Sequence, residues 1–132
     1  MEAKIDGQLK KFWLAYNDGW KPAVGHEVQV DNYRFSVCPT KKGIVISEVT
    51  TGMRIEVYGY NVITDTMCAT KEGMIDYINI FVVPRLISIV EKKDLGTIIK
   101  ECVAKAEKTL GKMPPIELVD ESILDPVSEI LN

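Results

Sequence analysis

Cys38 and His26 are the residues of this sequence that come closest to a catalytic pair. A thiolate nucleophile needs an adjacent base, and a hairpin joining His26–Val30 to Tyr33–Val37 would place His26 opposite Val37, next to Cys38. Side chains alternate between the two faces of a strand, so Cys38 would then point away from His26. We therefore expect His26 to be an ordinary residue at a strand start, and the sequence nominates no catalytic residue.

Motifs for phosphate binding, metal binding and hydrolysis are missing from the sequence. The nine glycines form neither a dinucleotide-binding fingerprint nor a P-loop, and there is no Cys-x-x-Cys pair and no G-x-S-x-G elbow. Glu48 and Glu56 fall on neighbouring predicted strands, but we expect both to face solvent rather than a cleft. The sequence therefore predicts no enzymatic activity, no cofactor and no metal.

The three cysteines, Cys38, Cys68 and Cys102, are odd in number and widely spaced, which is typical of reduced thiols rather than of a disulfide framework. The N-terminal residues show no apolar run behind a basic start, so we expect no secretory signal and a cytoplasmic protein.

The length of 132 residues predicts one domain, residues 1–112, followed by an acidic, proline-containing tail, residues 113–132. All 16 Lys and Arg residues lie at or before Lys112, whereas five of the 19 acidic residues lie in the tail. Within the tail, Asp125 and Pro126 predict the start of a possible short helix.

The first half of the domain predicts one helix and then strands. Apolar residues recur at helical spacing from Ile5 to Tyr16, and Asn17-Asp18-Gly19 would end that helix. Asp31-Asn32 predicts a tight turn that pairs Val30 with Tyr33 and Val28 with Phe35. A second hairpin is predicted at Thr50-Thr51-Gly52, with Gly52 left-handed, Val49 opposite Met53 and Val45 opposite Val57.

Residues 74–90 form the most apolar segment, with three possible structures: a membrane span, a buried helix, or two short strands meeting at Pro84. A span needs about 20 apolar residues, and this segment has 17, interrupted by Asp76, Asn79, Pro84 and Arg85. We expect a helix, kinked at Pro84 and capped by Thr70, and the two strands remain an alternative. Residues 95–110 predict a second amphipathic helix, capped by Asp94 and ended by Gly111.

These elements predict an α+β fold. It consists of an N-terminal helix, an antiparallel meander of three to four strands, two longer C-terminal helices packed on one sheet face, and the acidic tail.

The predicted function follows from surplus apolar surface. On a regular helical wheel, one side of residues 74–90 covers the sheet, and the opposite side must meet another helix or a second chain. That opposite side consists of Ile80, Val83, Ile87 and Val90. We expect a non-enzymatic protein-interaction or regulatory module that binds itself, as a homodimer, or another protein.

Two other functions remain open. The first is a small-ligand pocket between sheet and helices, lined by Trp13, Trp20 and Tyr77. The second is weak nucleic-acid binding by basic and aromatic residues on the outer sheet face, which the acidic balance of the chain disfavours. Its residues would be Arg34, Lys41, Lys42, Arg54, Tyr58 and Tyr60.

Overall fold

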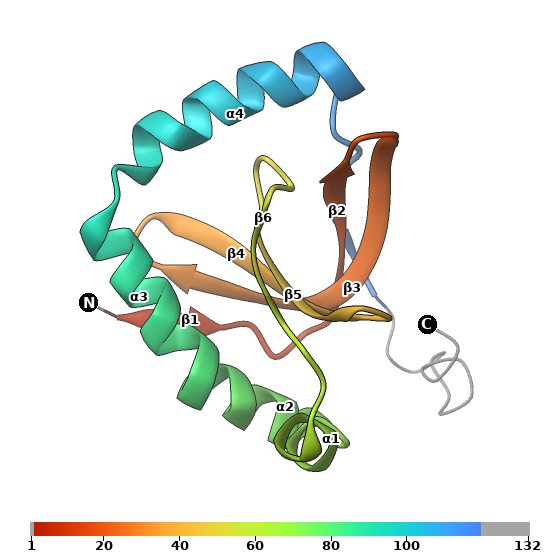
Figure 1. Ribbon diagram of the computed structural model, residues 1–132, viewed down its shortest axis with the longest axis vertical. Coiled ribbons are helices and arrows are strands. Elements are labelled where there is room, and N and C mark those ends of the chain that lie inside the picture. The colour runs from red at the N-terminus through yellow and green to blue at the C-terminus, as the bar shows by residue number, and fades with distance from the viewer. Residues whose placement is uncertain (1, 120–132) are drawn as a thin grey trace.

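A curled antiparallel sheet forms the centre of the protein, whose computed structural model describes residues 2–119 (Figure 1). The path through the sheet is β6-β5-β4-β3-β2-β7, and β1 pairs with β3 off this path. The strands are β1 (Ala3–Ile5), β2 (Lys10–Tyr16), β3 (Gly19–Val30), β4 (Tyr33–Thr40), β5 (Gly43–Glu48), β6 (Arg54–Tyr58) and β7 (Glu117–Leu118). The helical elements are α1 (Val62–Met67), α2 (Lys71–Tyr77), a π-helical turn η1 (Ile78–Val82), α3 (Val83–Lys92) and α4 (Leu95–Leu110).

The predicted N-terminal helix is wrong, because this segment forms strands β1 and β2. β2 pairs with the first half of β3 across a hairpin in which Tyr16 faces Gly19. Phe12 and Leu14 are buried from one face of β2, a period of two that the helical spacing of the same apolar residues concealed. The sheet therefore has more strands than the predicted meander of three to four.

The two hairpins predicted further along the chain are present. Val30 pairs with Tyr33 and Val28 with Phe35, and Val45 pairs with Val57. Gly52 has a φ of 67°, as the second turn requires. The pairing of Val49 with Met53 is wrong, because the register shifts after Ile46 and the N–H of Glu48 donates to the carbonyl of Met53 at 3.0 Å instead.

β3 changes partners halfway along its length, and this bend curls the sheet. Its residues up to Gly25 pair with β2, and those from His26 onward pair with β4. The curl brings β2 back to the turn after β5, where the N–H of Ala15 donates to the carbonyl of Gly52 at 2.8 Å. Each face of the sheet consequently has a core of its own.

The outer face carries the main core, which α2, η1 and α3 cover. Its fully buried members include Val28, Phe35, Ile44, Ile78 and Leu86. The inner face, inside the curl, carries a smaller core of Phe12, Cys38 and Val49, with Ala23 and Ile116 packed against them.

Residues 71–92 form one continuous helical segment, as predicted for 74–90. Thr70 caps its start, accepting from the N–H of Gly73. By length and composition this segment of 22 residues could cross a membrane, a criterion that core helices also meet. Here its buried side chains lie in the main core with the sheet.

α4 has the predicted bounds but not the predicted packing. Asp94 caps it, with its carboxylate accepting from the N–H of Thr97, and Gly111 follows its last turn. Of the residues in this helix only Leu95 is buried. Figure 1 shows α4 crossing from the end of α3 to the β2–β3 hairpin rather than lying flat on the sheet, so the prediction of two helices packed on one sheet face is wrong for α4.

The chain after α4 returns along β2. Trp20 and Trp13 donate their indole N–H groups to the carbonyls of Gly111 at 3.3 Å and Pro115 at 3.1 Å. β7 then pairs with the start of β2, and Glu117 forms an ion pair of 3.4 Å with Lys11. The possible helix predicted at Asp125–Leu131 lies outside the described residues.

Candidate interaction surface

The π-helical turn η1 lies at the centre of the apolar helix and is widened by one residue. The N–H of Val83 donates to the carbonyl of Ile78, five residues back. Pro84 follows at once, and a proline ring clashes with the carbonyl four residues before it in a regular α-helix. A π turn in this position relieves that clash, and such turns are frequent at functional sites.

This turn decides which apolar residues reach the core. An extra residue in one turn sets α3 back by about 100° relative to a regular helix. Val83, which directly follows the turn, consequently faces the sheet and is buried, as Met74, Ile78 and Leu86 are.

Two large apolar side chains of the helix formed by residues 71–92 remain exposed, and both lie within η1. Ile80 is 57% exposed and Phe81 is 42% exposed. We call these two residues, with the charged Asp76 and Arg85 on either side of them, the η1 surface. Asp76 and Arg85 are both exposed, and Arg85 Nε donates to Glu56 Oε1 at 2.8 Å.

An aromatic row supports the η1 surface from below. The ring of Phe81 lies 5.0 Å from that of Tyr77, and Tyr77 makes an edge contact with Tyr58 of β6, with ring centroids 6.3 Å apart. Burial raises the pKa of Tyr58 to about 12, so its hydroxyl stays protonated at neutral pH. The row fixes Phe81 to the sheet while leaving its outer edge in solvent.

The structure separates the four residues predicted for an interface. Ile80 is exposed, whereas Val83 is only 8% exposed and Ile87 and Val90 pack against the main core. Sequence reasoning missed Phe81, which a regular wheel turns toward the sheet. Pro84 is the sequence signal that could have identified Phe81, because the ring of an interior proline clashes with the preceding turn of a regular helix and favours an irregular turn there.

The predicted pocket residues do not come together. Trp13 and Trp20 lie on the β2–β3 hairpin and hydrogen-bond to the segment after α4. Tyr77 lies on α2 in the aromatic row, on the other side of the sheet.

The predicted nucleic-acid residues fall into three places. Lys41 and Lys42 form the exposed β4–β5 turn, and the hydroxyl of Tyr60 donates to the carbonyl of Thr40 beside it. Tyr58 belongs to the aromatic row, and Arg54 is exposed at the start of β6. Arg34 is held by a carboxylate, as described next.

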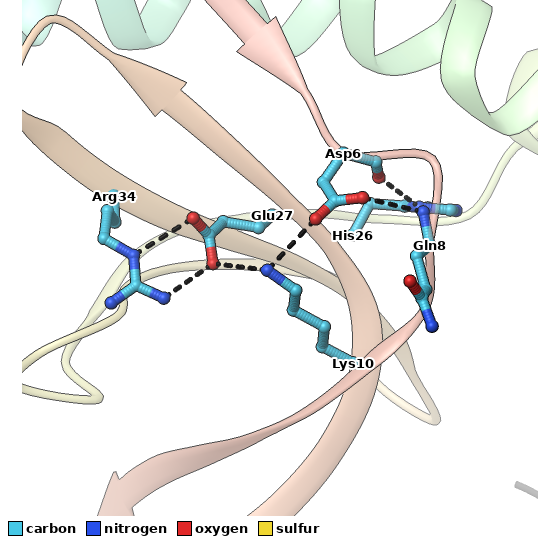
Figure 2. A network of polar contacts seen from close by, with 6 residues as sticks. All are labelled: Asp6, Gln8, Lys10, His26, Glu27 and Arg34. Carbon is cyan, nitrogen blue, oxygen red and sulfur yellow. Dashed lines mark hydrogen bonds and ion pairs between the residues drawn. The ribbon is translucent and has the colours of Figure 1, made fainter. Parts of the chain in front are cut away.

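A network of polar and charged side chains joins the link between β1 and β2 to β3 and β4 (Figure 2). Arg34 donates to both oxygens of Glu27, with Nη2 at 2.8 Å and Nε at 3.0 Å. Lys10 Nζ lies 3.2 Å from Glu27 and 3.0 Å from Asp6, and His26 Nδ1 lies 2.9 Å from the carbonyl of Asp6, so that Nδ1 carries the proton. The network ties the link between β1 and β2 to the sheet.

This network predicts acid sensitivity. The hydrogen bonds from Arg34, ahead of those from Lys10, lower the pKa of Glu27 below its usual value of 4.5. A lowered pKa contributes stability that is present above the unfolded-state value and is lost as the pH falls through the folded-state value. We expect the free energy of unfolding to drop as the pH falls below about 4.5, and to drop less in Glu27→Gln.

Urea titrations between pH 3 and pH 7 would measure this drop, with the exposed Glu107→Gln of α4 as the matched control. Equal pH profiles for the parent protein and Glu27→Gln would contradict the assignment.

The groups that the sequence offered for catalysis are buried or hydrogen-bonded to other parts of the fold. Burial raises the pKa of the Cys38 thiol to about 12, which leaves it unreactive. Glu48 accepts hydrogen bonds from Thr50 and Thr51 in the β5–β6 turn, and Glu56 holds Arg85. Within residues 2–119, no group of three or more His, Cys, Asp or Glu side chains could hold a metal ion.

No protein-family model, curated protein or solved structure matches this chain.

Proposed function

We propose that this chain is a non-enzymatic cytoplasmic protein-interaction module that self-associates through the η1 surface. The observation that carries the proposal is the exposure of Ile80 and Phe81, 57% and 42%, at the centre of a helix whose other large apolar side chains face the core. Contiguous exposed apolar surface with a polar rim is typical of protein–protein contacts.

The two other functions have less support. The pocket residues lie on different elements of the fold, and Arg34 of the nucleic-acid set is neutralised by Glu27. The η1 surface, in contrast, joins an aromatic anchor to flanking charges, the combination found at interaction hot spots.

The substitution Phe81→Glu tests the proposal. It puts a charge into the centre of the proposed contact, so we expect the parent protein to have twice the chain mass of 14.8 kDa, and the variant to have the mass of one chain. Light scattering behind a sizing column over a concentration series measures both.

Ile98→Glu is the matched control, because Ile98 is a similarly exposed apolar residue, 38%, on α4. This control should keep the parent's mass, and circular dichroism should show that both variants are folded. A parent protein that remains a single chain throughout the concentration series would contradict self-association.

A further inference from the structure

We propose that the occupant of the η1 surface is a second copy of this chain, whose Lys71–Lys92 helix packs antiparallel to the first about a twofold axis near Ile80 and Phe81. This inference rests on the proposed function and adds to it the geometry of the contact between the two copies. It is carried by the order of charges along the helix.

The charges on either side of the apolar centre are opposite and equally spaced. Asp76 precedes Ile80 by four residues, and Arg85 follows Phe81 by four residues. In an antiparallel pair centred on Ile80 and Phe81, Asp76 of each copy lies opposite Arg85 of the other. The twofold axis makes this contact twice, because an isologous interface repeats every pair.

The two ends of the helix each carry both signs, with Lys71 beside Glu72 and Glu91 beside Lys92, so the direction of the partner is set by Asp76 and Arg85 alone. A parallel partner would instead place Asp76 against Asp76 and Arg85 against Arg85, so the charge order selects the antiparallel arrangement.

Arg85 is prepared for this contact by its own chain. Its Nε donates to Glu56 at 2.8 Å, which fixes the plane of the guanidinium, and a guanidinium carries four further N–H donors for an incoming carboxylate. An orientation that is fixed before binding reduces the entropy lost in forming the pair.

The apolar side chains at the centre of the contact supply its affinity, and the charged pairs fix its register. Ile80 and Phe81 meet their counterparts at the twofold axis. The rim ion pairs add little affinity while intact, but reversing one sign creates like-charge contacts that penalise the wrong arrangement.

Charge reversal in two separate variants tests the geometry. Asp76→Arg alone gives four positive side chains at the two contacts of its dimer, and Arg85→Asp alone gives four negative ones. We expect each variant to self-associate about tenfold more weakly than the parent. Mixed in equal amounts, the two variants should form a heterodimer, since both contacts then join opposite charges.

Sedimentation equilibrium of the two variants, alone and mixed, measures these associations, and a fluorescent label on one variant reports the heterodimer directly. Arg85→Asp also removes the hydrogen bond from Arg85 to Glu56. If this variant were simply unfolded, adding Asp76→Arg would not produce a heterodimer. Heterodimer formation therefore reports the proposed contact.

The possible outcomes separate the two levels of the proposal. Recovery of the dimer only in the mixture supports the antiparallel arrangement. Parent-like dimers from each single variant would overturn this geometry and leave self-association standing. A parent protein that is monomeric alone and binds only a different protein would overturn the second copy as the occupant.

Discussion

Gly25→Ala is expected to destabilise the fold by about 3 kcal/mol, a large share of the roughly 5–15 kcal/mol by which an ordinary domain is stable. Gly25 is the last residue of β3 that pairs with β2, and pairing with β4 begins at the next residue, His26. A Cβ atom built there lies 2.0 Å from the carbonyl oxygen of Val37 and 2.8 Å from Cα of Cys38. Both are backbone atoms of a buried strand, so neither can rotate away.

The expected loss of stability in Gly25→Ala therefore comes from weaker pairing of β3 with β4 as well as from poorer packing. To admit a methyl group, β3 and β4 must separate where the inner core is closed by Cys38 and Phe12, and the close packing of an interior transmits such a shift.

Urea denaturation followed by tryptophan fluorescence would measure the effect of Gly25→Ala. Gly59→Ala is the matched control, because a Cβ at Gly59 meets nothing within 4 Å and the backbone there is not left-handed. We expect the control to stay within about 0.5 kcal/mol of the parent. A similarly small change in Gly25→Ala would show that the strands can separate at the bend without loss.

The sequence predicts the parts of this fold that are specified locally. The Asp31-Asn32 turn and Gly52 fix their hairpins through turn chemistry, and the pairs Val28–Phe35 and Val45–Val57 follow from them. The capping residues Thr70 and Asp94 likewise mark the helix starts that the structure has.

The parts that depend on distant partners could not be predicted in this way. Phe12 and Leu14 fit a helical stripe with Ile5 and Tyr16 as well as they fit one face of a strand, and only the pairing of β2 with β3 and β7 decides between the two. The weak packing of α4 is equally invisible to periodicity, because an amphipathic stripe does not show what covers it.

The candidate site was partly predictable for a related reason. A regular wheel places Ile80 and Val83 on one side of the helix, whereas the π turn separates them into an exposed and a buried residue. The geometry of that turn depends on Pro84 and on the packing of Leu86 and Ile89 in the main core. That packing involves residues from several strands, so a local sequence pattern does not reveal it.

Leu86→Ala should lower the free energy of unfolding by about 2–5 kcal/mol, the cost of a cavity at a fully buried leucine. Leu86 is 1% exposed and belongs to the main core with Phe35 and Ile78. η1 sets α3 back by about one residue, which moves Val83 from the outer side of the helix to the core side. The turn itself can therefore be tested at Val83 and Ile80.

Val83→Ala and Ile80→Ala distinguish a π turn from a regular helix. With the π turn, Val83→Ala loses buried methyl groups and costs about 1–2 kcal/mol, while Ile80→Ala stays within about 0.5 kcal/mol. In a regular helix the two residues share one side, and their substitutions would cost similar amounts. Urea unfolding should be followed at concentrations low enough to keep the protein monomeric, since any association through Ile80 would add to its apparent stability. Equal losses of unfolding free energy in the two variants would contradict the π turn. They would also contradict the explanation that this turn places Ile80 and Phe81 together on the outside.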